Sequence, residues 1–122
     1  MTAVTLLLAF ILGLLFLGTG ALKLLVPHEH GRARIGWIGD LSPRTYRLAG
    51  WLEVAGSIGL MFPTMVQAFD WLTPIAAAGL ALIMTGAATL HVRRKEWKPF
   101  SLTLALLVGC AVVMLAPALG WE

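Results

Sequence analysis

Four long apolar stretches, nearly free of charged residues, constrain the fold of this chain more than any other feature. They cover residues 1–22, 48–65, 71–90 and 99–121, and Glu53 is the only charged residue inside any of them. An α-helix rises about 1.5 Å per residue, so each stretch with its flanks supplies the roughly 20 residues that cross a hydrocarbon core about 30 Å thick. The sequence therefore predicts an all-α protein, a bundle of four transmembrane helices.

The overall composition agrees with this interpretation. Of the 122 residues, 59% are hydrophobic and 12% are charged, and the mean hydropathy is +0.87. Soluble domains carry about 25% charged residues. The first apolar stretch lacks a basic region before it and is longer than the core of a signal peptide, so we expect it to be a membrane span. Residues 1–122 are expected to form a single membrane domain.

The six prolines lie near the boundaries of these stretches and predict where the helices begin and end. Ser42 and Pro43 combine a hydroxyl N-cap with a proline at the first helical position, which predicts the start of the second helix. Thr73 and Pro74 repeat this pattern for the third. Pro99 predicts the start of the fourth helix. Pro27, Pro63 and Pro117 predict the ends of the first, second and fourth helices. The predicted helices cover residues 3–26, 43–62, 73–92 and 99–117.

The basic residues predict how the chain is oriented in the membrane. All nine Lys and Arg residues lie in or beside the first and third loops, whereas the second loop and both termini have none. Basic residues of short loops remain on the cytoplasmic side. We therefore expect both termini on the extracytoplasmic side, in a membrane that we expect to be the bacterial inner (plasma) membrane. Topology and anionic lipid headgroups account for the pI of about 9.6, so no nucleic-acid partner is expected.

The first loop, residues 27–42, is longer than a tight connection requires. Its apolar residues, Trp37 among them, lie between arginines, which suits a segment in the headgroup layer. An interfacial cytoplasmic loop is the simpler interpretation, and a binding lid is the alternative. His28 and His30 are only two residues apart on this loop, which is a weak signal for a metal site, and we expect no metal.

Three ionisable residues form the main functional clue. Lys23, Glu53 and His91 lie in or at the edges of three different apolar segments, and alternating helix directions bring all three to the cytoplasmic half of the bundle. Glu53 lies deepest, roughly 9 Å beyond Arg47 along the helix axis. A carboxylate at that depth is costly unless it is neutral or paired. Lys23 is the natural counter-ion.

Helical spacing adds neighbours to these residues. Counting by threes and fours places Glu53 on one face of the second helix with small or polar residues, and Thr19 on one face of the first helix with Lys23. We predict a ligand-binding or proton-exchanging site formed by Lys23, Glu53, His91, Thr19, Tyr46 and Ser57. A structural Lys23–Glu53 ion pair is the alternative, with Lys23 as an anchor that reaches the interface and His91 as an interfacial residue.

Small residues recur on the first three predicted helices and predict close helix packing. They are Gly13, Gly18, Gly20, Gly50, Ala55, Gly56, Gly59, Ala78, Gly79 and Gly86.

Three segments, in order and on the expected helices, resemble the DoxX-like family of small four-helix membrane proteins. They are residues 20–24 (GALKL), 50–60 (GWLEVAGSIGL) and 87–91 (AATLH). The resemblance extends over nearly the whole chain. The family is named after a subunit of a thiosulfate:quinone oxidoreductase, so the resemblance implies a link to membrane redox systems. Each segment is short and glycine-rich, and the resemblance therefore supports the fold more than the function.

Three classes of function fit these observations. The first is an accessory or quinone- or lipid-binding component of a membrane redox system, in a homo-oligomer or a larger complex. No residue supplies an electron carrier, and Cys110 is the only cysteine, so no stand-alone catalytic activity is expected. The second is a structural or chaperone-like membrane protein that binds a partner protein. The third is a small proton-coupled transporter that uses Glu53.

Overall fold

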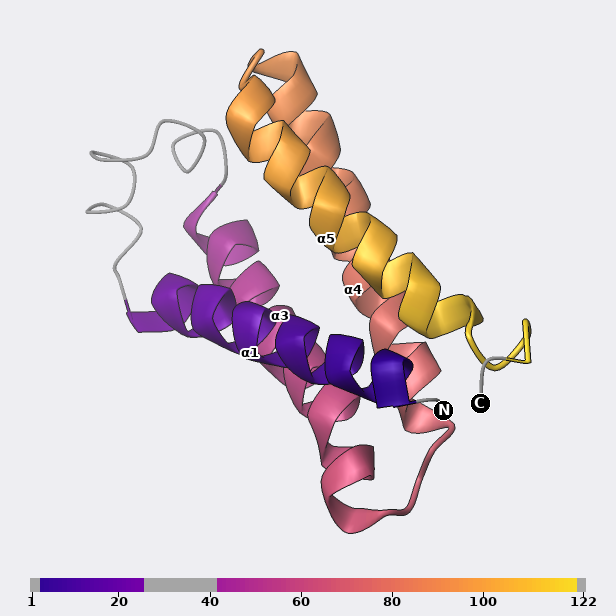
Figure 1. The fold of residues 1–122 in the computed structure, drawn as a ribbon. Helices are drawn as coiled ribbons and strands as arrows, with labels where there is room; N and C mark the ends of the chain where they lie inside the picture. Colours follow the sequence, from indigo (N-terminus) through magenta and orange to yellow (C-terminus); the bar gives the residue numbers. More distant parts are fainter. Residues whose placement is uncertain (1–2, 26–41, 121–122) are drawn as a thin grey trace.

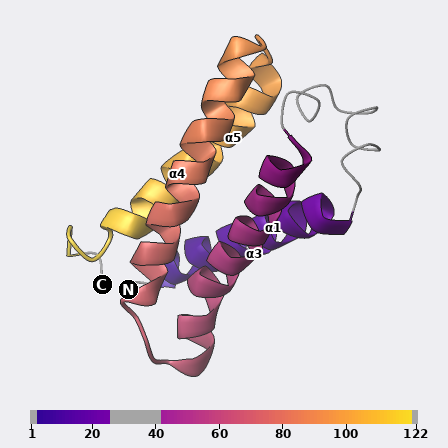
Figure 2. The same cartoon turned by 180° about the vertical axis from the view of Figure 1, so that it is seen from behind.

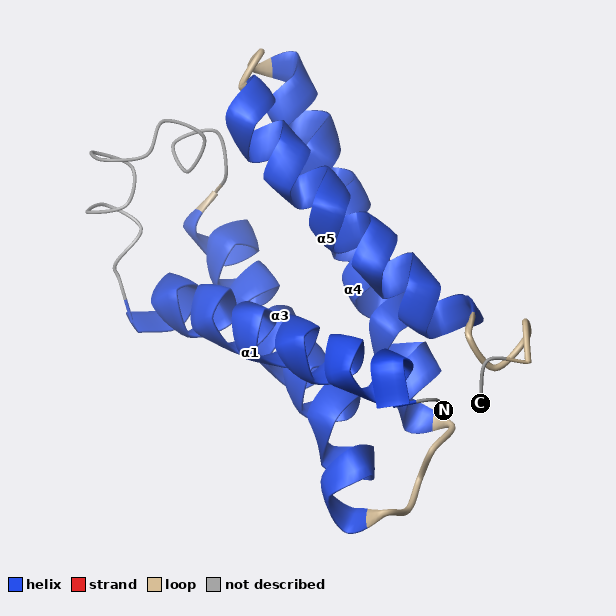
Figure 3. Cartoon of the chain, viewed as in Figure 1, coloured by secondary structure: helices blue, strands red, loops and turns tan. Residues whose placement is uncertain are grey.

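The computed structural model describes residues 3–25 and 42–120, and in this part of the chain it contains four α-helices and no strand (Figures 1 and 3). The helices are α1 (Ala3–Leu25), α3 (Pro43–Val66), α4 (Leu72–Arg93) and α5 (Trp97–Leu115). Each is long and apolar enough to cross a membrane. The chain is thus an integral membrane protein with the predicted four spans. The predictions for Trp37, His28 and His30 lie outside the described residues.

The helices form two antiparallel pairs. α1 packs mainly on α3, and α4 packs on α5; contacts between α3 and α4 join the pairs, and α1 touches α5 less extensively. The pairs diverge toward the last turns of α1 and α4 and the first turns of α3 and α5 (Figures 1 and 2). This divergent end contains the residues next to the first and third loops, where the sequence predicted the site.

The apolar core lies between the two pairs. Its fully buried side chains include Phe16 from α1, Leu60 from α3, Leu80 from α4 and Val113 from α5. Cys110 is also fully buried, as expected for an inert thiol in an apolar setting. Large apolar side chains on all four helices face outward, as a lipid environment requires.

The start of α3 follows the prediction, but its end does not. Ser42 is the N-cap, its Oγ accepts a hydrogen bond from Thr45 N at 3.1 Å, and Pro43 is the first helical residue. The predicted stop at residue 62 is wrong, because the helix continues through Pro63 to Val66. A proline removes one backbone donor without ending the helix when the following turn still forms. Here Ala68 N donates to the Pro63 carbonyl at 3.2 Å.

Two other proline predictions also fail in detail. Thr73 is not an N-cap: α4 begins at Leu72 and the cap position is Trp71, which makes no side-chain capping bond. α5 begins at Trp97, so Pro99 is its third residue rather than its first. The first-turn N–H groups of a helix have no intrahelical partner, so a proline fits anywhere in that turn. α5 ends at Leu115, two residues before the predicted end.

A tight reversal joins α4 to α5. Lys95 adopts the left-handed conformation with φ of 56°. Glu96 N donates to the His91 carbonyl at 2.9 Å, and Lys95 N donates to the Val92 carbonyl at 3.0 Å. This pair of bonds is the Schellman motif, which satisfies the last carbonyl groups of a helix. The motif returns Glu96 to the last turn of α4, beside His91.

Glycine packing is confirmed at some positions and wrong at others. A Cβ atom on Gly20 would lie 2.8 Å from the carbonyl oxygen of Gly50, so the backbones of α1 and α3 approach closely at this point. Gly18, Gly79 and Gly86 have nothing within 4 Å of such an atom among the described residues. Within residues 3–25 and 42–120, these three glycines are open positions and do not contribute to helix packing.

Candidate functional site

The close approach of α1 and α3 brings Lys23 and Glu53 together. Gly20 and Gly50 lie three residues before Lys23 and Glu53, so each charged residue is one helical turn from the crossing point. Lys23 Nζ donates to Glu53 Oε2 at 2.6 Å. The Glu53 side chain is only 1% exposed and that of Lys23 is 15% exposed. The predicted pairing of the two residues is therefore confirmed.

His91 is more buried than the sequence indicated. It was considered as an interfacial residue beside arginines, but it is only 5% exposed. Its Nδ1 lies 3.1 Å from Oε1 of Glu96, and Arg94 Nε lies 3.3 Å from the same oxygen. The sequence analysis missed Glu96. The available signal was that Glu96 is the only acidic residue in the basic third loop, where it stands between Lys95 and Lys98.

A cavity of about 460 Å³ lies between the helix pairs at their divergent end. All four helices contribute to its wall. The lining residues are Phe16, Thr19 and Lys23 from α1; Thr45, Ala49 and Glu53 from α3; Ile83, Met84, Gly86, Ala87, Leu90 and His91 from α4; and Pro99, Leu102, Thr103 and Leu106 from α5.

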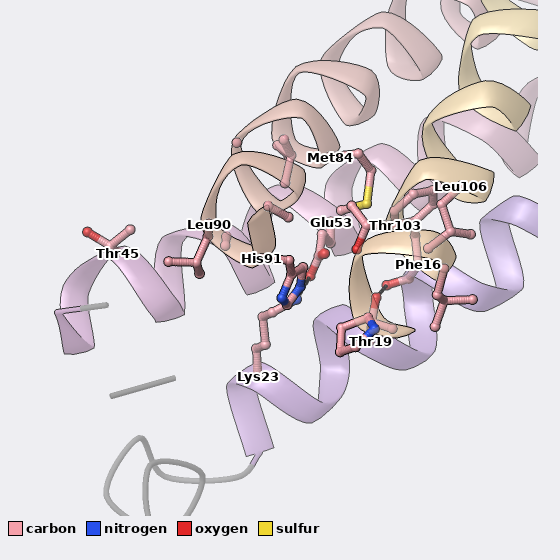
Figure 4. Close-up of a pocket in the computed structure, with 16 residues that line it drawn as sticks. Phe16, Thr19, Lys23, Thr45, Glu53, Met84, Leu90, His91, Thr103 and Leu106 are labelled. Atoms are coloured by element: carbon pink, nitrogen blue, oxygen red, sulfur yellow. Dashed lines mark hydrogen bonds and ion pairs between the residues drawn. The ribbon is translucent and has the colours of Figure 1, made fainter. Parts of the chain in front are cut away.

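The cavity wall is largely apolar, and its charged or titratable groups come from three helices. Figure 4 shows Lys23, Glu53 and His91 extending from α1, α3 and α4 toward one region of the cavity. Thr103 from α5 adds a hydroxyl group to the same wall. An apolar cavity with a few convergent polar groups is typical of a small-molecule binding site.

Three further residues were predicted for the site, and the structure separates them. Thr19 lines the cavity, and its Oγ1 donates to the Phe16 carbonyl at 3.2 Å. Tyr46 and Ser57 are buried on the same face of α3 as Glu53, as the spacing predicted. Ser57 Oγ donates to the Val54 carbonyl at 2.7 Å. Among the described residues, neither Tyr46 nor Ser57 belongs to the cavity wall.

Comparison with known proteins gives a family match. The sequence profile of the DoxX-like family matches residues 5–115, which include nearly all of the four helices and the whole cavity wall. No curated protein and no solved structure matches this chain.

Proposed function

The chain belongs to the DoxX-like family, and from this membership together with the cavity we propose that it binds a quinone-type molecule as an accessory component of a membrane redox system. The observation that supports the proposal is the apolar cavity with Lys23, Glu53 and His91 in its wall. Its volume of about 460 Å³ lies within the range of about 300–1,000 Å³ that is typical of small-molecule sites.

The chemistry of the wall suits an amphipathic ligand of this class. A quinone head carries two oxygen atoms on a flat apolar ring, and its isoprenoid tail is soluble in the bilayer. The Lys23 ammonium group offers hydrogen bonds to such oxygens, and the His91 imidazole adds a second polar group to the same wall. Phe16, Met84 and Leu106 offer apolar contacts to the ring.

The proposal assigns binding to this chain and electron transfer to a partner. We propose that oxidation or reduction of the bound molecule falls to another protein of the complex. We place this assembly in the bacterial inner membrane, as a homo-oligomer or a hetero-complex that brings the cavity close to a redox partner.

A cavity-filling substitution tests the proposal. Gly86 lines the cavity, and nothing lies within 4 Å of a Cβ atom built on it. Gly86→Leu is therefore expected to occupy cavity space without disturbing helix packing. Quinone binding to the purified protein in lipid nanodiscs, measured by titration with decylubiquinone, should weaken at least tenfold.

Gly79 supplies the matched control. It lies two turns earlier on α4, is equally open, and does not line the cavity. Gly79→Leu adds the same side chain to the same helix and should leave quinone binding unchanged. If wild-type protein and both variants bind decylubiquinone equally, or if none of them binds it, the proposal is wrong.

A structural role is the second candidate, because the Lys23–Glu53 bond of 2.6 Å joins α1 to α3 directly. Glu53→Gln distinguishes the two roles. Loss of quinone binding in a variant that still inserts and folds supports the ligand site, whereas failure to assemble supports a purely structural pair.

A further inference from the structure

Glu96 occupies an unusual place in the structure. It is the N-cap residue of α5, yet its side chain makes no capping bond to that helix. Its Oε1 lies instead 3.1 Å from His91 Nδ1. The backbone N–H of Glu96 also donates to the His91 carbonyl at 2.9 Å. Two bonds of different kinds therefore join Glu96 to one residue of the cavity wall.

The side-chain bond determines which nitrogen of His91 carries hydrogen. An ionised carboxylate only accepts hydrogen bonds, so His91 Nδ1 must be the donor. In a neutral imidazole with hydrogen on Nδ1, Nε2 is an acceptor. Metal-binding histidines are oriented by carboxylates through the same arrangement.

We propose that Glu96 is a positioning residue that holds His91 in the Nδ1–H tautomer, so that Nε2 accepts a hydrogen bond from a hydroxyl group of the ligand. The ligand form that offers a hydroxyl is the reduced quinol, whereas the oxidised quinone has only acceptor oxygens. The inference rests on the proposed function and specifies it: the site prefers quinol to quinone.

Other charged groups lie close to Glu96 or line the same cavity as His91. Arg94 contacts the carboxylate of Glu96, with Nε 3.3 Å from Oε1. Lys23 and Glu53 enter the cavity wall from α1 and α3, and α5 contributes the uncharged Thr103. Lys23 remains a donor for the second oxygen of the head, which is an acceptor in quinone and quinol alike.

Glu96→Ala tests the inference, because it removes the carboxylate and keeps the backbone N–H that closes the turn. The tautomer is read from the ¹⁵N signals of His91 in histidine-labelled protein without ligand at about pH 9, well above the pKa of about 6.5 that histidine has in model peptides. The chain has three histidines, and His91→Asn identifies the signals of this one. Wild type should show hydrogen on Nδ1, and Glu96→Ala should shift it toward Nε2.

Binding of decylubiquinol and decylubiquinone is then compared under anaerobic conditions at the same pH. Glu96→Ala should weaken quinol binding about five- to tenfold, as expected for one lost hydrogen bond, and should change quinone binding less than about twofold. Arg94→Gln is the control. It removes the other contact of the same carboxylate oxygen and should preserve both the tautomer and the quinol preference.

The outcomes separate this inference from the function on which it rests. Unchanged His91 signals in Glu96→Ala, or equal losses of quinol and quinone binding, overturn the positioning role while leaving quinone-type binding in place. If wild type binds neither form, the proposed function fails and the quinol preference fails with it. The ligand-free His91 signals still decide whether Glu96 sets the tautomer.

Discussion

At the scale of single residues, the Lys23–Glu53 pair combines two different environments. Glu53 is 1% exposed, whereas Lys23 is 15% exposed and lies in the last turn of α1. A long lysine side chain can turn toward the headgroup layer when it loses its partner, but a glutamate side chain cannot reach that far. Removing Lys23 and removing Glu53 should therefore lower the stability of the protein by different amounts.

We predict that Lys23→Met is more destabilising than Glu53→Gln. Lys23→Met leaves a buried unpaired carboxylate, and breaking a buried pair in this way costs about 3–5 kcal/mol. Glu53→Gln should cost less, because Lys23 can reorient. Free energies of unfolding in mixed micelles measure both effects.

The double variant Lys23→Met/Glu53→Gln completes the cycle. It should be more stable than Lys23→Met alone, because the second change removes the stranded charge. Simple addition of the two single costs would show that the residues do not interact.

At the scale of helices, the crossing of α1 and α3 is set by Gly20 and Gly50. A Cβ atom on Gly50 would meet Lys23 Cβ at 2.9 Å and the Gly20 carbonyl oxygen at 3.1 Å. Backbone atoms cannot move aside as a flexible side chain can. A larger residue at either position must push the helices apart, and with them the ion pair one turn away.

Gly20→Ala is accordingly predicted to destabilise the protein by about 1–3 kcal/mol, the usual cost of an overpacked contact. Gly18→Ala is the matched control on the same helix, since nothing lies within 4 Å of its Cβ position. It should be neutral or stabilising by up to about 1 kcal/mol, because alanine favours helix over glycine. Thermal unfolding of both variants in one detergent checks the prediction, and equal effects at the two positions would contradict it.

At the scale of the whole molecule, the two helix pairs diverge at one end and enclose the cavity there. The cavity wall includes residues next to the first and third loops. All nine basic residues of the chain lie in these two loops or beside them. By the charge rule we predict that this end faces the cytoplasm. Polar groups of a ligand would then lie near the cytoplasmic headgroup layer.

Cysteine labelling tests this orientation. Asp70 in the second loop and Lys98 at the start of α5 are both exposed, and Cys110 is the only natural cysteine. In a Cys110→Ala background, Asp70→Cys should react with a membrane-impermeant maleimide in intact bacterial spheroplasts. Lys98→Cys should react only after the membrane is opened. Labelling with the opposite pattern would invert the bundle and place the cavity on the outer side.

The sequence by itself determined the four spans, and it indicated a buried Glu53 with Lys23 as its natural counter-ion. These features depend on properties read along one segment: apolar length, helical period and the cost of an isolated charge in lipid. The ends of the helices were harder to predict from the sequence. Pro63 and Thr73 show why, since the same residue types are tolerated inside a membrane helix or in its first turn.

Only the tertiary structure decided which side chains share a cavity. Tyr46 and Ser57 lie on the predicted face of α3 without belonging to the cavity wall, whereas Thr45 and Ala49 of the same helix do belong to it. Glu96 reaches His91 only because Lys95 turns the chain back in a left-handed conformation, which the composition of a basic loop does not reveal. Membrane insertion depends on each segment and its charge alone, whereas the cavity depends on contacts between residues far apart in the chain.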